Sequence, residues 1–349
     1  MKSLKVGVIF GGMSTENEVS VVSGKNILEN MDAKKYDIYP IYIDKNGLWY
    51  EYLGEYKKLE MEKTPEKINK IENIMEYLSN LDIIFPVLHG LYGEDGTIQG
   101  LFELLQLPYV GCKVLASSVG MDKVYTKIIF EKAGISQTKS IYIRKAKENY
   151  IYIKANFDEL ALQLDELCKE VEKEIKYPMF VKPSNSGSSV GVTKAEKTEE
   201  LKEAIKEAEK YDNKILIEQG IDGIEVECAV LGNEEVIAGE VGEIKAADEF
   251  YSYDAKYNNE QSKTIIPANI PQVTKEKVKE LAIKAFKAID GKGLSRVDFF
   301  VENKTGKIYL NEINTMPGFT QISMYPKLME AYGIQYKDLI DKLINLAME

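Results

Sequence analysis

The chain has 349 residues, of which 44% are apolar and 29% are charged, and its formal net charge is −11 at pH 7. This length predicts two or three domains, and this composition allows each of them a real hydrophobic core. The acidic balance argues against a nucleic-acid partner, whose phosphates need a basic surface, although local lysines can still bind an anionic substrate.

Cysteine usage and the lengths of the apolar runs indicate a cytoplasmic protein. Cys112, Cys168 and Cys228 are widely spaced and form no CxxC pair, so neither a disulfide framework nor a zinc site is indicated. The apolar run at the N-terminus has the length of a strand and is shorter than the apolar core of a signal peptide. No stretch approaches the ~20 apolar residues that cross a bilayer, so no membrane partner is expected.

The first third of the chain alternates predicted strands with helices. The predicted strands are LKVGVIF (4–10), DIYPIYI (37–43) and LDIIFPVLHG (81–90). A helix is expected after the first glycine turn, and the charged stretch 56–79 is predicted to be a helix-prone surface insertion. This alternation is typical of a mostly parallel α/β domain, whose ligands gather beyond the carboxyl ends of the strands. We place this domain at residues 1–121.

Two further domains are predicted, over 122–217 and 218–349. Expected elements of the second are a helix (123–134), a charged stretch that becomes helical towards its end (145–176), and a strand hairpin with the tip SNSGSSVG (184–191). Apolar residues alternate with period two from residue 225 onward, which predicts an antiparallel sheet in the third domain. Its later elements are a helix (275–290), two strands (294–303 and 307–314) and a closing helix (336–347).

The two strands before the closing helix carry the most informative side chains. Alternation places Arg296 and Asp298 on one face of the first strand, and Glu312 and Asn314 on one face of the second. Pairing across the short turn brings Asp298 opposite Glu312. Carboxylate and carboxamide oxygens are the ligands that Mg²⁺ prefers, together with water and substrate phosphates. The alternative is a solvent-facing strand pair whose arginine neutralises the acids, and the spacing alone does not separate the two.

The hairpin tip at 184–191 offers backbone N–H groups and hydroxyls to an anion. It is not a Walker loop, because Gly-Lys-Ser/Thr is absent and a strand follows it. Lys182 before the tip and Lys123 on the preceding helix could reach nucleotide phosphates. Glu218 and Glu225 bracket a short connection where a carboxylate could accept from a ribose hydroxyl. Taken alone, the tip is better explained as a flexible hairpin end than as a phosphate-binding loop.

Two residues of the first domain are candidates for a site. Glu16 lies in the first turn of the helix after the glycine turn, where it could complement the helix dipole or bind the ammonium group of a small substrate. His89, the single histidine, ends a predicted buried strand and is followed by LYGEDG. A lone histidine is commonly a satisfied structural residue, but this position at a strand's carboxyl end favours a site.

The stretch EFYSYDAKY (249–257) holds four aromatic residues around one lysine. A core aromatic cluster would explain this composition. A stacking platform for single-stranded nucleic acid is disfavoured by the net charge of −11.

Together, these motifs resemble those of D-alanine–D-alanine ligases. The motifs are GGMSTENEVS, HGLYGEDGTIQG, MDK, KPSNSGSSVGV, EFYSYDAKY, RVDFF and NEINTMPGFT, and they cover nearly the whole chain. Members of this family are ATP-grasp enzymes that make the dipeptide terminus of peptidoglycan precursors. The resemblance implies an α/β (α+β overall) protein with an N-terminal Rossmann-like parallel sheet, two further α+β domains and an active-site lid near 246–264.

The resemblance also implies a mechanism and a set of site residues. One D-alanine carboxylate attacks the γ-phosphate of ATP, and the amine of a second D-alanine attacks the resulting acyl phosphate. The implied ligands of two Mg²⁺ ions, which Mn²⁺ can replace, are Asp298, Glu312 and Asn314. The implied ATP-binding residues are Lys123, Lys182, Ser188, Glu218, Ile221, Glu225 and, arriving with the lid, Lys256. The implied substrate residues are Glu16 and His89 for the first amino acid, Arg296 and the N–H of Gly318 for the oxyanion, and Ser323 and Met324 for the second amino acid.

Tyr257 is implied to form a hydrogen-bonded trio with Glu16 and Ser188 and to organise the site. Its ordinary pKa of about 10 makes it a poor general base, and no other base is assigned. A homodimer is implied as well.

The second substrate remains open between D-alanine and D-serine. Lactate-forming relatives commonly have a histidine where this chain has Tyr257, so D-lactate is disfavoured. A small pocket rejects one extra hydroxyl only weakly, so D-serine stays an alternative. A non-catalytic ATP-binding protein would be expected to lack Arg296 or the metal ligands, which this chain retains. A carboxylase of the same superfamily would need a biotin partner, which nothing in the sequence suggests.

Replacing Glu312 by glutamine tests the predicted metal ligands. The carboxamide keeps the shape of the side chain but loses the charge that attracts Mg²⁺. We expect Mg²⁺-dependent ATP binding to weaken, measured by titrating ATP at several Mg²⁺ concentrations. An unchanged Mg²⁺ requirement would contradict the assignment of Glu312 as a ligand.

Overall fold

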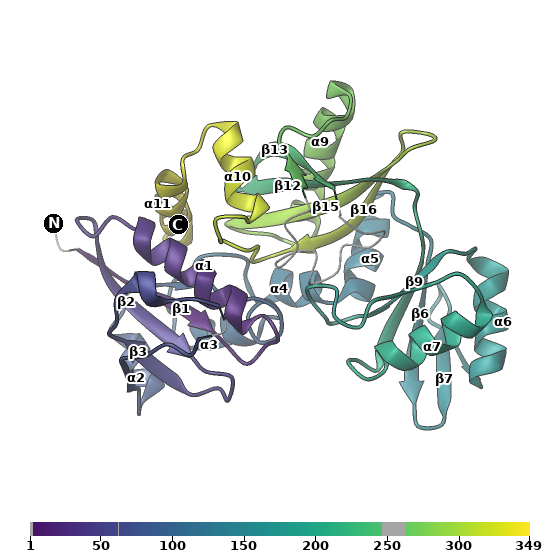
Figure 1. The fold of residues 1–349 in the computed structure, drawn as a ribbon, viewed down its shortest axis with the longest axis horizontal. Coiled ribbons are helices and arrows are strands. Elements are labelled where there is room, and N and C mark those ends of the chain that lie inside the picture. Colours follow the sequence, from purple (N-terminus) through teal and green to yellow (C-terminus); the bar gives the residue numbers. More distant parts are fainter. Residues whose placement is uncertain (1–2, 62, 246–262) are drawn as a thin grey trace.

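The computed structural model describes residues 3–61, 63–245 and 263–349, which form three β-sheets flanked by helices (Figure 1). The predicted α/β fold class is therefore confirmed. Among these residues, none of the helices combines the length and the apolar character that crossing a lipid bilayer requires.

The first sheet has the strand order β4-β3-β2-β1-β5. Its strands are β1 (Leu4–Gly11), β2 (Tyr36–Ile43), β3 (Trp49–Tyr52), β4 (Ile68–Lys70) and β5 (Ile83–Pro86). The three predicted strands β1, β2 and β5 are parallel, and β3 and β4 extend the sheet as an antiparallel edge. The accompanying helices are α1 (Asn17–Asn30), η1 (Tyr56–Lys58), α2 (Ile74–Ser79), α3 (Thr97–Leu104) and α4 (Val114–Met121). The stretch 56–79 is less helical than predicted, because it also contributes the edge strand β4.

The second sheet is antiparallel and has the order β10-β9-β11-β6-β7-β8. Its strands are β6 (Ser140–Ala146), β7 (Asn149–Ile153), β8 (Glu159–Leu162), β9 (Met179–Pro183), β10 (Thr193–Ala195) and β11 (Lys214–Gln219). Its helices are α5 (Lys123–Lys132), α6 (Leu164–Glu174) and α7 (Thr198–Ala208). The predicted hairpin around the Gly/Ser tip is confirmed as β9–β10. The charged stretch from 145 is helical only in α6, because buried Tyr150 and Tyr152 alternate as strand residues in β7.

The third sheet is antiparallel and has the order β14-β13-β12-β15-β16. Its strands are β12 (Gly223–Leu231), β13 (Ile237–Lys245), β14 (Lys263–Ile265), β15 (Leu294–Glu302) and β16 (Ile308–Asn314). Its helices are α9 (Gln272–Ala288), α10 (Met324–Tyr332) and α11 (Tyr336–Ala347), the last as predicted. In the β15–β16 pair, Asp298 lies opposite Glu312 and Arg296 opposite Asn314, which confirms the predicted register.

The two ends of the chain share a hydrophobic core. Phe10 and Phe85 of the first sheet belong to the same cluster of buried side chains as Leu328 of α10 and Leu343 of α11. Phe85 also packs edge-on against Phe319, with ring centroids 6.0 Å apart. The second sheet has a separate core with α6 and α7. The loops that follow β5, β9 and β16 line one cavity between the sheets, while the predicted domain boundaries remain a prediction.

Candidate active site

Two cavities adjoin one another where the three sheets meet. The smaller has a volume of about 130 Å³ and the larger of about 420 Å³. Both are lined by Lys123, Ser186, Ser188, Ile244 and Glu312, so these residues form the boundary between them. The two cavities therefore share a wall made of these side chains.

Most of the predicted site residues line one of these cavities. Those on the smaller cavity are Glu16, His89, Ser188, Arg296, Asn314, Gly318, Ser323 and Met324, and those on the larger are Lys182, Glu218, Ile221 and Glu225. Asp298 is buried beside Arg296. Lys256, Tyr257 and most of the predicted lid lie outside the described residues.

The larger cavity contains a buried carboxylate held by two lysines. Glu218 on β11 lies 2.6 Å from the Lys182 amine and 2.5 Å from the Lys127 amine, and it accepts a hydrogen bond from the Thr138 hydroxyl at 2.7 Å. Burial alone would raise the pKa of Glu218, but the two lysines hold it far below its usual range. The carboxylate therefore stays ionised and pairs with both lysines, of which Lys182 lines the cavity.

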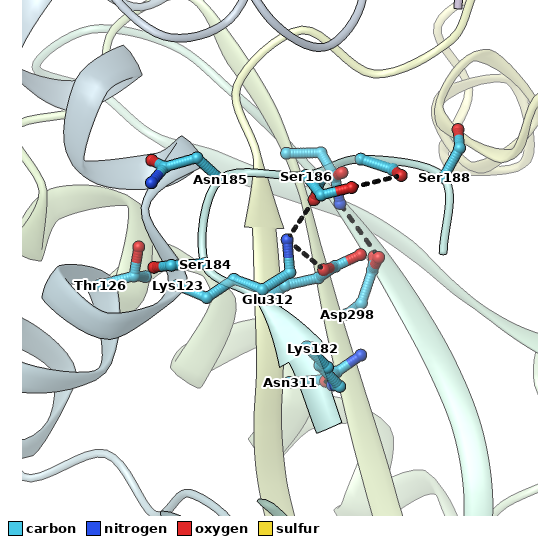
Figure 2. A network of polar contacts seen from close by, with 12 residues as sticks. Lys123, Thr126, Lys182, Ser184, Asn185, Ser186, Ser188, Asp298, Asn311 and Glu312 are labelled. Carbon is cyan, nitrogen blue, oxygen red and sulfur yellow. Dashed lines mark hydrogen bonds and ion pairs between the residues drawn. The ribbon is translucent and has the colours of Figure 1, made fainter. Parts of the chain in front are cut away.

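The Gly/Ser hairpin tip is anchored on α5 (Figure 2). The Lys123 amine donates to the Ser186 carbonyl at 2.6 Å and lies 3.7 Å from Glu312, and the Ser184 hydroxyl donates to Asp122 at 2.6 Å. Ser188 and Ser189 have φ angles of 49° and 60°, in the left-handed region. Successive residues of this kind can turn backbone N–H groups towards one point, as in anion-binding loops.

Glu16 joins the first sheet's helix to this hairpin tip. The Ser188 hydroxyl donates to the Glu16 carboxylate, which is only 8% exposed. A Cβ atom on Gly90 or Gly187 would lie 2.5 Å from Glu16 Oε2. A side chain at either position would push the Glu16 carboxylate aside, and Gly90 also has a φ of +72°, so the two glycines let two loops close around the carboxylate.

Arg296 lies in the middle of an acidic group on the third sheet. Its guanidinium is 3.0 Å from Glu227 and donates to both oxygens of Asp298 at 2.8 and 2.7 Å. The Asn314 amide also donates to Asp298, at 3.0 Å. Burial alone would lower the pKa of Arg296, but the neighbouring carboxylates raise it well above its usual value. Arg296 is therefore a permanent cation on the wall of the smaller cavity.

His89 uses both ring nitrogens within the protein. Nδ1 lies 3.0 Å from the Met316 carbonyl, and Nε2 lies 3.0 Å from the Ser23 hydroxyl. Burial lowers the pKa of the imidazole, so the ring is neutral at pH 7. This arrangement agrees with the structural alternative for a lone histidine, and a contact between His89 and a substrate stays a prediction.

Gly318, Ser323 and Met324 form the opposite wall of the smaller cavity. The Ser323 hydroxyl accepts from the Thr320 N–H at 3.0 Å, and a Cβ on Gly318 would lie 2.7 Å from Ser323 Oγ. A Cβ on Gly242 of β13 would lie 2.2 Å from Met324 Cε. A larger residue at position 242 would therefore displace the end of the Met324 side chain.

Sequence reasoning missed three charged residues of the site. Lys127 follows Lys123 by four residues, so it shares a face of α5. Glu227 follows Glu225 by two residues, so it shares a face of β12. Glu94 lies within the quoted stretch HGLYGEDG, and its pKa is raised to about 8, first by burial and then by the nearby Glu16. The spacing of Lys127 and Glu227 and the motif around Glu94 are visible in the sequence. Their partners lie on other elements, however, so local pattern could not assign a role to any of the three.

The chemistry of the predicted metal ligands fits a hard divalent cation. Asp298 and Glu312 face each other in register, and Asn314 adds a carboxamide. Within the described part of the chain, no three His, Cys, Asp or Glu side chains gather as a metal-binding group. The predicted set has two carboxylates and a carboxamide, so substrate oxygens would have to complete the coordination.

Comparisons with known proteins match the whole chain. Family models described as the D-ala D-ala ligase N-terminus and C-terminus match residues 5–112 and 129–345. The chain is 49% identical to the D-alanine–D-alanine ligase of Acetivibrio thermocellus, covering 99% of this chain and 96% of that protein. It is 51% identical to that of Clostridium acetobutylicum, covering 98% and 97%.

The chain is also similar to solved structures of such ligases over nearly its full length. The VanG D-Ala:D-Ser ligase from Enterococcus faecalis has a TM-score of 0.86 at 38% identity, covering 99% of this chain and all of that one. The D-alanine-D-alanine ligase from Coxiella burnetii has a TM-score of 0.85 at 33% identity, covering 100% of this chain and 94% of that one.

Replacing Lys127 by methionine tests the lysine pair at the larger cavity. Glu218 would keep its charge but lose one of its two cations, so its uncompensated charge would repel a polyphosphate. We expect the Kd of a non-hydrolysable ATP analogue to rise about tenfold, which corresponds to about 1.4 kcal/mol. Lys132→Met, at the exposed end of the same helix, is the matched control. Equal affinities of the two variants would contradict the role of Lys127.

Proposed function

Because the chain belongs to the D-alanine–D-alanine ligase family over its whole length, we propose that it joins two D-alanine molecules at the expense of ATP. The product would be the dipeptide used in peptidoglycan precursors, made in the cytoplasm. One observation carries this proposal: the two cavities adjoin at Lys123, Ser186, Ser188 and Glu312. An amino-acid carboxylate in the smaller cavity would then meet a terminal phosphate in the larger one.

The larger cavity would hold ATP. Lys123 and Lys182 offer cations to the phosphates, Lys127 pairs with Glu218, and Ile221 and Glu225 lie along the same cavity for the nucleoside. Asp298, Glu312 and Asn314 would hold Mg²⁺, or Mn²⁺ in its place, and the bound metal would neutralise phosphate charge during transfer. A cluster of fixed cations suits phosphoryl transfer, since catalysis there is mostly positioning and charge stabilisation.

The first D-alanine would bind in the smaller cavity with its ammonium group at Glu16. Its carboxylate oxygen attacks the γ-phosphorus, the bond from that phosphorus to the β,γ-bridging oxygen breaks, and ADP leaves. The product is an acyl phosphate, which water could hydrolyse if the cavity were open. Holding the attacking oxygen near the phosphorus supplies the main advantage, because it replaces a collision between two free molecules.

The second D-alanine would lie against Ser323 and Met324. Its amine, after losing one proton, attacks the acyl carbon and gives a tetrahedral oxyanion. Arg296 and the N–H of Gly318 would stabilise that oxyanion, and as the carbonyl re-forms the phosphate leaves as hydrogen phosphate, which accounts for the second proton lost by the attacking nitrogen. Arg296 suits this role, because it keeps its charge and offers fixed donors.

D-Alanine is favoured over D-serine as the second substrate. The relatives named above at 49–51% identity are D-alanine–D-alanine ligases, whereas the D-Ala:D-Ser ligase is 38% identical. A D-serine product remains the second candidate, since one hydroxyl is discriminated only weakly in a small pocket. The homodimer implied by the sequence remains a prediction.

Substrate-dependent phosphate release tests the proposed function. ATP consumption is measured with D-alanine alone, with D-alanine plus D-serine, and with D-alanine plus D-lactate, and each product is identified by its mass. We expect D-alanine alone to stimulate release and to give the dipeptide as the main product. A mixed product in excess would favour the D-serine alternative. The proposal fails if none of these substrates stimulates phosphate release.

A further inference from the structure

The residues on either side of Gly318 are held by side chains from the first hundred residues. The Met316 N–H donates to Glu94 Oε1 at 2.9 Å, and the Met316 carbonyl lies 3.0 Å from His89 Nδ1. The second carboxylate oxygen of Glu94 accepts from the Gly90 N–H at 2.8 Å. Both polar groups of residue 316 are thus bound by one loop that lies more than 200 positions earlier in the chain.

Phe319 is held in the same way from helix α1. Its N–H donates to the Ser23 hydroxyl at 3.1 Å, and its carbonyl accepts from the Asn26 amide at 3.1 Å and from the Tyr336 hydroxyl at 2.8 Å. Ser23 is fully buried and Asn26 is 4% exposed, so little water competes for these bonds. The peptide after Gly318 is therefore held at its N–H, as the two peptides of Met316 are held.

The chemistry of these groups determines which one donates and which one accepts in each hydrogen bond. A carbonyl can only accept, so His89 Nδ1 must carry the proton that is donated to Met316. The neutral ring then accepts at Nε2, and the Ser23 hydroxyl must donate to it. The Ser23 oxygen in turn accepts from the Phe319 N–H. One continuous series of bonds thus connects the residues that flank Gly318.

We propose that Ser23, Asn26, His89 and Glu94 are positioning residues that set the direction of the Gly318 N–H in the reaction. We call these four residues the loop clamp. The inference rests on the proposed function, in which that N–H stabilises the tetrahedral oxyanion. A donor misplaced by a fraction of an ångström loses much of its effect on an oxyanion, since the benefit depends on preorganised geometry. The first domain thereby controls the second chemical step as well as the binding of the first substrate.

Ser23→Ala separates this role from a purely structural one. It removes the hydroxyl that links Phe319 to His89 and leaves a small side chain on the helix. Ser20→Ala is the matched control: Ser20 is also fully buried on α1, and its hydroxyl bonds Gly11 and Val87 instead of the loop. Glu94→Gln is the second variant; it keeps its shape, but its NH₂ group must face the N–H of Met316 or of Gly90.

Two rates are compared in each protein. Dipeptide formation needs the oxyanion donor, whereas acyl-phosphate formation involves no tetrahedral carbon. The second rate is measured by exchange of heavy oxygen out of the β,γ-bridge of labelled ATP in the presence of D-alanine. The KM for ATP and the melting temperature are recorded alongside.

We expect Ser23→Ala and Glu94→Gln to lower dipeptide formation about tenfold, while oxygen exchange stays at or above the wild-type rate. Ser20→Ala should lower the melting temperature similarly and leave both rates within about twofold. The loop clamp is wrong if the two rates fall together in Ser23→Ala and Glu94→Gln, or if neither falls. A wild-type protein that shows neither exchange nor ligation would overturn the proposed function itself, and the clamp with it.

Discussion

The rest of the site depends on one buried arrangement of charges, the Arg296 guanidinium between Glu227 and Asp298. Such a group is stable away from water only if every charge has a partner with good geometry. Neighbouring strands β12, β15 and β16 supply those partners, because their register sets Glu227 and Glu312 on either side of Asp298. The cation thus faces the cavity in a fixed position, beside the carboxylates that we propose as metal ligands.

Around this arrangement, each sheet contributes one part of the chemistry. The second sheet brings lysines and the Gly/Ser tip to the larger cavity, and the first brings Glu16 and the loop at His89 to the smaller one. Buried side chains of the first sheet pack in one core with those of α10 and α11, so the contributions of the first and third sheets belong to one unit. The second sheet has its own core, and it meets that unit through the bond from Ser188 to Glu16 and through contacts of α5.

Sequence reasoning predicted features that depend on short-range geometry. The register of Asp298 against Glu312 follows from a short turn and the period of two, and the Gly/Ser hairpin follows from turn-forming residues between two apolar runs. The strand pair at 140–153 was not predicted, because charged residues interrupt the alternation of apolar and polar side chains along it. Lys127 and Glu94 could not be assigned, since their partners Glu218 and Met316 lie on other sheets or loops. The two bonds of His89 were equally beyond local pattern, because they join three distant segments.

The most direct test of the central claim is the rate of dipeptide formation by Arg296→Lys, measured beside its affinity for a non-hydrolysable ATP analogue. Lysine keeps the positive charge between Glu227 and Asp298, but it loses the planar fork that can donate to Asp298 and to an oxyanion together. The account predicts that ligation falls about 100-fold or more, while the Kd of the analogue changes less than about threefold. Near-normal ligation, or a loss of ligation explained entirely by lost nucleotide binding, would contradict it.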